Sequence, residues 1–288
     1  MTIQKKVVEL FGHSAAHTNL NWQEIVASQS CAYTDRACYK IRKSDPTVAI
    51  GSCSVTYGRG NASGPVVICP TRFTERRQIF ADCLHLLMTH EPGNQLHILP
   101  EVAIPGGNVD YFVVSVRDGR VRDFAGIEIQ TLDTTGTVWP ARQRLLRELE
   151  IPQNDNMADS RDSYGMNWKM TAKTILVQMH HKIQTFQHLN KKLILVVQDH
   201  LLNYMEREFN FGHLANPAML GDSMHIHAYS LSLKQNREYT MSLDRRLSTD
   251  AAGIEVCMGL QAEARVELDQ IVGLLESRIS DANLFTPF

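Results

Sequence analysis

A predicted β-hairpin in the first half of the chain restricts the fold more than any other feature of the sequence. Its two arms, residues 110–116 and 121–131, are rich in β-branched and aromatic residues, which favour extended strands. Between the arms stands Asp118-Gly119, a dipeptide typical of hairpin turns. The segment therefore predicts two antiparallel strands that are adjacent in a sheet.

The register of this hairpin determines which side chains meet. A two-residue turn pairs Asp110 with Ile127, whereas a three-residue loop pairs Asp110 with Glu128. Either register places the two carboxylates within one residue of each other. Because strand side chains alternate, Glu128 and Gln130 should share one face, while Ile127 and Ile129 fill the other.

The resulting cluster of hard oxygen ligands suggests a magnesium site. The residues have the spacing Asp-x17-Glu-x-Gln, and Glu101 in Pro100-Glu101 precedes them as a further candidate. Two carboxylates suit Mg²⁺ when the ion must also keep waters and a phosphate oxygen. Asp110 and Glu128 would hold the metal, and Gln130 would orient the attacking water. The alternative is a solvated hairpin with scattered acids, but a carboxylate within so apolar a hairpin favours a site.

Length and composition indicate an ordinary globular protein. A chain of 288 residues with 43% hydrophobic residues can bury a large core. We expect a small N-terminal module over residues 1–75 and a catalytic domain over 76–288. The sequence has no export signal, and its densest apolar run, residues 193–197, is too short to span a bilayer, so we expect a cytoplasmic protein without a membrane role.

Four cysteines are concentrated in the first quarter of the chain. Cys31, Cys38, Cys53 and Cys69 have the spacing C-x6-C-x14-C-x15-C. Because a reducing cytosol disfavours disulfides, these residues are better interpreted as thiolate ligands to one metal ion. Both Zn²⁺ and iron suit four sulfur ligands. The alternative is four buried free thiols.

The same part of the chain is basic. Residues 31–80 contain eight basic and three acidic residues, a net charge of +5, which leaves −7 for the rest of the chain. A basic lobe beside an acidic body favours contact with DNA phosphates over a merely solvated face. The candidate contacts are Arg42, Lys43, Arg59 and Arg72.

Apolar periodicity predicts the remaining elements. We expect helices at 74–89, just after Pro140, at 168–188 and at about 261–280, strands at 96–104 and 192–197, and a loop at 151–166. The apolar stripe of the last helix fits core packing or a dimer contact. His225 and His227 alternate on a likely strand, but a metal pair there would lack a third ligand.

Several short segments together resemble one enzyme family. These are Arg42-Lys-Ser-Asp-Pro46, Ile50-Gly-Ser-Cys-Ser-Val55, Val67-Ile-Cys-Pro-Thr-Arg-Phe73 and Ile127-Glu-Ile-Gln130. With them the chain resembles the NotI family of Type II restriction endonucleases, in motif order from about Cys31 to Thr131. The resemblance implies a PD-(D/E)xK nuclease core of α/β (α+β) class, a mixed sheet flanked by helices, with glutamine in place of lysine.

The resemblance also implies cofactors and partners. In that family four cysteines hold one iron atom, which assigns Cys31, Cys38, Cys53 and Cys69 as iron ligands here. Asp110, Glu128 and Gln130 would be the catalytic set, with Glu101 as a fourth member. We therefore expect a bacterial, homodimeric, Mg²⁺-dependent endonuclease that cleaves double-stranded DNA at a palindromic, GC-rich site.

Two other classes of protein fit part of this pattern. A metal-stapled DNA-binding regulator would use the hairpin acids only structurally and would bind DNA without Mg²⁺. A redox protein would use the four-sulfur centre for electron transfer and would ignore DNA. Loss of Asp110 should inactivate the enzyme but leave a regulator unaffected.

Overall fold

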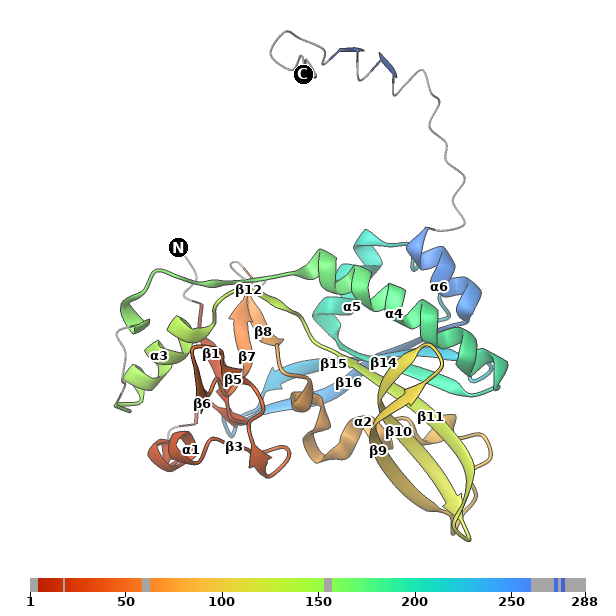
Figure 1. The fold of residues 1–288 in the computed structure, drawn as a ribbon, viewed down its shortest axis with the longest axis horizontal. Helices are drawn as coiled ribbons and strands as arrows, with labels where there is room; N and C mark the ends of the chain where they lie inside the picture. The colour runs from red at the N-terminus through yellow and green to blue at the C-terminus, as the bar shows by residue number, and fades with distance from the viewer. Residues whose placement is uncertain are drawn as a thin grey trace, which may run out of the picture.

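Two sheets organise the part of the chain that the computed structural model describes, namely residues 5–17, 19–58, 63–152, 157–259, 272–273 and 276–277. The smaller sheet belongs to an N-terminal lobe, and the larger one lies beside it in a second lobe (Figure 1). Hydrophobic contacts run continuously from the first lobe into the second, so the two share one core.

The larger sheet has six strands in the order β16-β15-β14-β11-β10-β9. The central pairs β11–β14 and β14–β15 are parallel, and the outer pairs are antiparallel. Its strands are β9 (Gln95–Ile104), β10 (Gly107–Arg117), β11 (Arg120–Gln130), β14 (Lys192–Gln198), β15 (Met224–Leu233) and β16 (Tyr239–Thr249). Strand β14 is buried along its whole length, as expected for a parallel strand covered on both faces.

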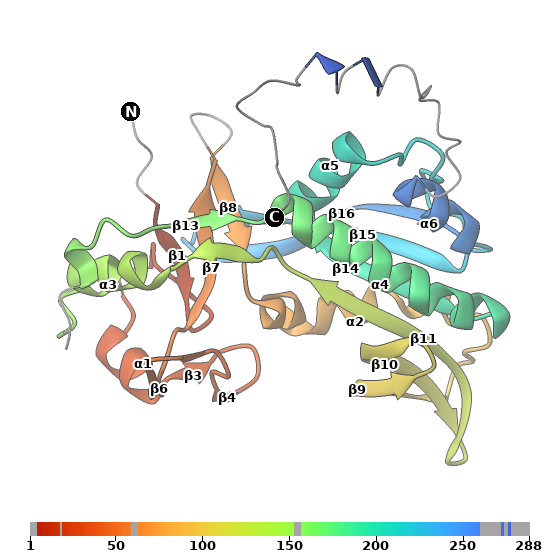
Figure 2. The ribbon, with the colours of Figure 1, turned by 45° about the horizontal axis from the view of Figure 1, so that its top comes forward.

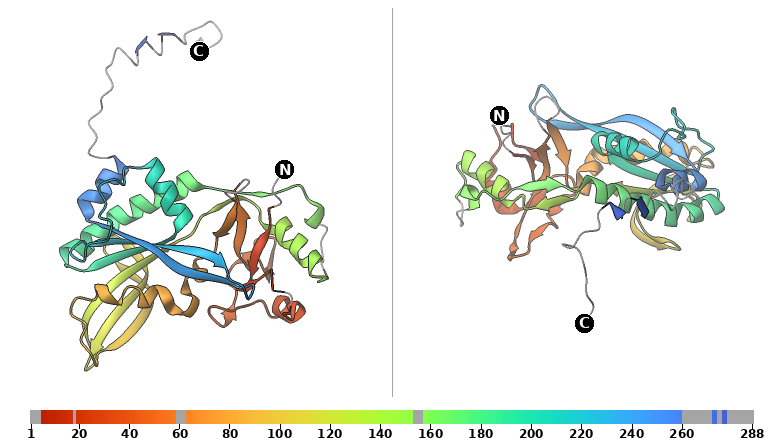
Figure 3. Two further views of the ribbon diagram at one scale, coloured as in Figure 1. Left: turned by 180° about the vertical axis from the view of Figure 1, so that it is seen from behind. Right: turned by 90° about the horizontal axis from the view of Figure 1, so that it is seen from above.

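Helices cover both faces of this sheet. On one face lie α4 (Trp168–His188), α5 (Asp199–Glu208) and α6 (Ala251–Met258), and Figure 2 shows α4 running across the strands. On the other lie the short segments η2 (Pro70–Arg77), α2 (Gln78–Ala81) and η3 (Leu84–Leu86). Figure 3 shows the same arrangement from behind and from above. The predicted mixed sheet flanked by helices is thus confirmed.

The N-terminal lobe is built from short elements. Its four-stranded sheet has the order β2-β1-β7-β8, and two ribbons, β3-β4 and β5-β6, extend from it. The elements are β1 (Val7–Leu10), β2 (His13–Ser14), α1 (Trp22–Ser28), β3 (Ser30–Cys31), β4 (Arg36–Ala37), β5 (Ile41–Arg42), β6 (Asp45–Ala49), β7 (Ser52–Tyr57) and β8 (Gly64–Val67).

A later segment of the chain returns to this lobe. It comprises β12 (Thr134–Gly136), α3 (Trp139–Glu148), η4 (Met157–Asp159) and β13 (Tyr164–Met166). Tyr164 donates its hydroxyl to the carbonyls of Lys6 and Thr56, and Arg142 of α3 donates to the carbonyl of Ile50. Residues from both sides of the hairpin therefore contribute to the N-terminal lobe.

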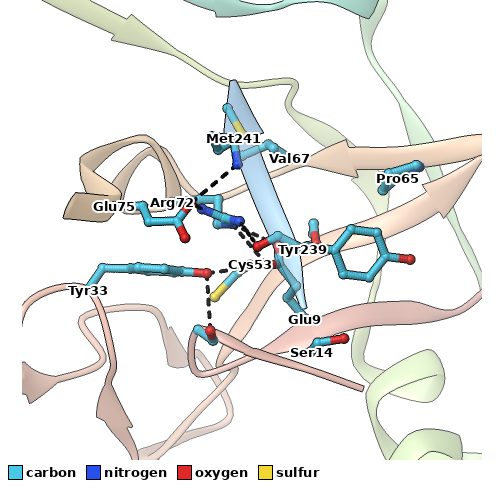
Figure 4. A network of polar contacts seen from close by, with 12 residues as sticks. Glu9, Ser14, Tyr33, Cys53, Pro65, Val67, Arg72, Glu75, Tyr239 and Met241 are labelled. Carbon is cyan, nitrogen blue, oxygen red and sulfur yellow. Dashed lines mark hydrogen bonds and ion pairs between the residues drawn. The ribbon is translucent and has the colours of Figure 1, made fainter. Parts of the chain in front are cut away.

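A buried ionic network joins the two lobes (Figure 4). The Arg72 guanidinium donates to Glu9 of β1, to Glu75 at 2.7 Å and to the Tyr239 carbonyl of β16 at 2.9 Å. The second Glu9 oxygen accepts from the Ser54 hydroxyl at 2.6 Å. Arg72 is fully buried and Glu9 nearly so, which makes this pair an internal connection between the smaller sheet and the edge of the larger one.

Most predicted elements are present, with two differences. The expected helix at 74–89 is divided into three short segments, and the first break falls at Arg76 and Arg77, which have left-handed backbone angles with φ of +50° and +56°. Its apolar residues are nevertheless buried, so the periodicity identified the packed side chains and missed the break. The expected loop at 151–166 contains η4 and β13. Most of the predicted last helix, 261–280, lies outside the described residues.

Candidate active site and cysteine cavity

The register of the β10–β11 hairpin combines features of both predicted alternatives. The turn is the two-residue type, with Asp118 and Gly119 at φ of +53° and +70°. A bulge follows in β11 at Arg122, and beyond it Tyr111 pairs with Ile127. The extra residue shifts every later pair by one position. Asp110 therefore lies level with Glu128, as in the three-residue register.

Asp110 and Glu128 face helix α4 from adjacent strands. The Asp110 carboxylate accepts a hydrogen bond from the Ile129 backbone N–H at 2.8 Å, which holds it against β11. Glu128 is buried, with 6% of its surface exposed, and Asp110 is half-buried. Ile127 and Ile129 pack into the hydrophobic cluster on the opposite face, as the alternation of strand side chains predicted.

Glu101 and Gln130 lie on the two sides of this pair. In β9 the pairs Val109–Val102 and Tyr111–Pro100 bracket Glu101, which places it across from Asp110. Glu101 is exposed and has φ of +51°. Gln130 is half-buried, and its amide donates to the Thr131 carbonyl at 2.9 Å. The structure thus aligns Glu101, Asp110 and Glu128 on three consecutive strands.

A lysine that the sequence analysis did not single out also belongs to this site. Lys182 of α4 donates from Nζ to Glu128 Oε1 at 2.7 Å, and both side chains are less than one-tenth exposed. Burial, together with the charge of Asp110, raises the pKa of Glu128 to about 7. The Lys182 ammonium opposes this shift. The available signal was a lysine next to the apolar stripe of a well-defined helix.

The chemistry of this site suits a hard divalent cation. Two carboxylates from adjacent strands offer oxygen ligands and leave other positions for waters and a phosphate oxygen, as Mg²⁺ requires. In the part of the chain that the structure describes, no group of three or more His, Cys, Asp or Glu side chains has metal-binding geometry. A metal ion at the hairpin would use the Asp110 and Glu128 carboxylates together with waters, a phosphate oxygen or a backbone carbonyl.

The four clustered cysteines line one small cavity in the N-terminal lobe. Cys31, Cys38, Cys53 and Cys69 come from separate segments and line a small cavity with a volume of about 30 Å³. A hydrogen bond joins Cys53 to Cys69, and together with the nearby Lys40 charge it lowers the pKa of the Cys69 thiol to about 5. Four sulfur donors are the type of set that binds iron or zinc. Among the described residues, however, no three of these side chains are grouped closely enough to hold a metal ion.

Comparison with known proteins identifies the family. A family model described as restriction endonuclease NotI matches residues 26–225, which include the four cysteines, the hairpin and α4. The chain belongs to the NotI restriction endonuclease family. No curated protein matches the chain. The resemblance inferred from the sequence motifs is thus confirmed, and a NotI family member is a Type II restriction endonuclease whose partner is DNA.

The expected DNA-contacting residues of this NotI family member have different environments. Arg42 is half-buried, and its guanidinium carbon lies 4.3 Å from the centre of the Trp139 ring. Lys43 is exposed. Arg59 lies outside the described residues. The expectation for Arg72 was wrong, because its buried guanidinium is bound within the network of Figure 4 and is not accessible to a phosphate. Among the described helices, none is long and apolar enough to cross a membrane.

Proposed function

We propose that this NotI family member is a homodimeric, Mg²⁺-dependent endonuclease that hydrolyses both strands of a palindromic, GC-rich DNA site in the bacterial cytoplasm. The observation that carries the proposal is the level placement of Asp110 and Glu128 on adjacent strands, with Gln130 two residues further along the same strand. A two-fold dimer would present two such sites to a two-fold DNA sequence.

Each residue of the site has a distinct role in this proposal. Asp110 and Glu128 hold Mg²⁺, and Glu101 lies beside them as an exposed fourth member. When bound, Mg²⁺ supplies polarisation of the scissile phosphate and lowers the pKa of a coordinated water. Gln130 carries no charge, so its amide serves to orient the attacking water.

The cysteine cavity has a structural role in the same proposal. Four thiolates would hold one iron atom, or zinc, and so connect the short strands and ribbons of the N-terminal lobe. The four cysteines support this role because they all line a single small cavity. With this lobe fixed, the exposed Lys43 and the half-buried Arg42 would contact DNA phosphates.

Asp110→Asn tests the proposed function directly. The full-length protein with Mg²⁺ is incubated with a defined genomic DNA, and the new ends are sequenced. Asp110→Asn should slow cleavage at least about 1000-fold, while binding to the same site in Ca²⁺ stays within about threefold, because base and phosphate contacts determine affinity. The matched control is Asp118→Asn, a change at the exposed tip of the same hairpin, where Asn tolerates the left-handed backbone.

The outcomes separate the proposed enzyme from its alternative. Cleavage by Asp110→Asn within tenfold of the parent would refute the active-site assignment. A parent protein that bound one sequence without cutting it, with or without Mg²⁺, would instead support a metal-stapled DNA-binding protein.

A further inference from the structure

Helix α4 brings a buried lysine to a site whose hairpin supplies only carboxylates and an amide. Lys182 Nζ lies 2.7 Å from Glu128 Oε1, and its side chain is 9% exposed. Gln130, two residues after Glu128, has no charge, and its amide donates to a backbone carbonyl. Lys182 is therefore positioned to supply the positive charge that Gln130 lacks.

The surrounding backbone fixes where Lys182 enters the site. The turn between β9 and β10 packs directly on α4, because Thr185 donates its hydroxyl to the Pro105 carbonyl at 3.0 Å. A Cβ at Gly106 would lie 2.6 Å from the His181 carbonyl oxygen, and one at Gly107 would lie 3.4 Å from Lys182 Cε. At Gly106 only glycine permits this close approach, and at both positions the positive φ, +100° and +127°, favours glycine. The aliphatic part of the Lys182 side chain thus lies against the turn between β9 and β10.

Stability alone does not explain this ion pair. Burying two charges costs solvation energy that their attraction only partly returns, and an apolar pair of similar volume is often as stable. The pair also involves Glu128, one of the two carboxylates of the site. A lysine at this position therefore calls for a chemical role.

We propose that Lys182 is the cationic catalytic residue of this enzyme, and that its ammonium contacts the scissile phosphate during hydrolysis. The proposal rests on the proposed function. In that step the water oxygen forms a bond to phosphorus and the water releases a proton to solvent. The bond from phosphorus to the leaving nucleoside oxygen breaks, and that oxygen takes up a proton from solvent. One additional negative charge builds on the phosphoryl oxygens before the bond breaks, and a fixed ammonium stabilises it.

The distance to Glu128 sets the expected size of the effect. Lys182 Nζ lies 2.7 Å from Glu128 Oε1, so a phosphate oxygen bound beside this carboxylate would lie within about 7 Å of the ammonium. A unit charge at that distance, at an effective dielectric constant of about 20, changes the rate on the order of 50-fold.

The chain offers a matched control in Lys191→Met. Lys191 Nζ pairs with the buried Asp123 at 2.6 Å near the other end of β11, so the control also removes a lysine–carboxylate pair. In single-turnover cleavage by the full-length protein, Lys182→Met should be about 50-fold slower than the parent, and Lys191→Met within about threefold. Adding Gln130→Lys to Lys182→Met should raise the cleavage rate at least tenfold, because the new lysine returns an ammonium to the face of the sheet that carries Glu128. A double variant as slow as Lys182→Met would overturn the charge assignment.

Calorimetric titration with Mg²⁺ in the absence of DNA gives a readout other than activity. At about pH 8.5, Lys182→Met should bind Mg²⁺ at least threefold more tightly than Lys191→Met, because the ammonium competes for the Glu128 oxygen. A parent that cuts no DNA would refute the proposed function, and the titration would still test Lys182. Equal Mg²⁺ affinity in the two lysine variants, or equal cleavage rates, would overturn the proposal.

Discussion

Two buried histidines predict how the stability of this protein depends on pH. His225 and His227 of β15 are 1% and 0% exposed, and they face the side of the larger sheet covered by η2, α2 and η3. His225 Nδ1 and His227 Nε2 have no hydrogen-bond partner within the described structure. The ionisable groups near these rings are Cys83, His85, Lys192, Asp222 and Arg246.

Burial and the neighbouring positive charges disfavour the protonated rings. Burial lowers the pKa of His225 to about 4 and that of His227 to about 3, below the usual value of 6.5. The unfolded chain therefore binds more protons than the folded one below pH 6.5, so stability is retained above that pH and is lost as the pH falls. From pH 7.5 to 5.5 each histidine should cost about 1.3 kcal/mol, and the two together about 2.7 kcal/mol.

The effect is measured as a difference between variants, by urea unfolding at each pH. Glu128 shifts in the opposite direction, since burial raises its pKa to about 7 and its protonation stabilises the folded state as the pH falls. Comparison of the parent with His225→Gln/His227→Gln cancels this contribution. The parent should lose about 2.7 kcal/mol relative to that variant between pH 7.5 and 5.5. A relative loss below about 0.5 kcal/mol would refute the reasoning. As a control, His97→Gln changes an exposed histidine and should leave the pH dependence of the free energy of unfolding as it is in the parent.

Three further substitutions test other parts of the structure. Arg72→Met should lower the free energy of unfolding, measured by urea unfolding, by about 3–5 kcal/mol, because Glu9 would remain as an unpaired buried charge. A loss below about 1 kcal/mol would contradict the role of the network. Cys53→Ser should lower the content of bound iron or zinc, determined by elemental analysis, and weaken DNA binding while the hairpin residues stay intact; full metal content would argue against the four-cysteine site. Gln130→Ala should slow single-turnover cleavage at least about tenfold with little change in DNA affinity, and an unchanged rate would exclude it from the reaction.

The hairpin of the candidate active site was predictable because its determinants are local. The turn dipeptide, the alternation along the arms and the spacing of Asp110 and Glu128 all lie within about twenty residues of sequence. The sequence left two registers open, since a bulge is not visible in a pattern of residue types. The structure resolves the choice by combining a two-residue turn with an extra residue at Arg122.

The basic residues show where the sequence was insufficient. Arg72 and Lys43 contribute equally to the net charge of residues 31–80, yet one is fully buried and the other is exposed. The partners of Arg72 include Glu9 and Tyr239, at opposite ends of the chain, so no local pattern indicates that this charge is internal. Net charge predicts the surface potential of a lobe only after such internal pairs are removed.

Lys182 illustrates the same limit for the candidate active site. A helix of 21 residues was predicted correctly from its apolar stripe, but the stripe does not show which polar neighbour turns inward. That depends on the glycine turn at 106–107, which belongs to a different part of the sheet and approaches the helix at His181 and Lys182. The hairpin specifies the carboxylates, whereas the packing of the turn on α4 specifies the cation. The complete set of charges in this site is therefore a property of the tertiary structure.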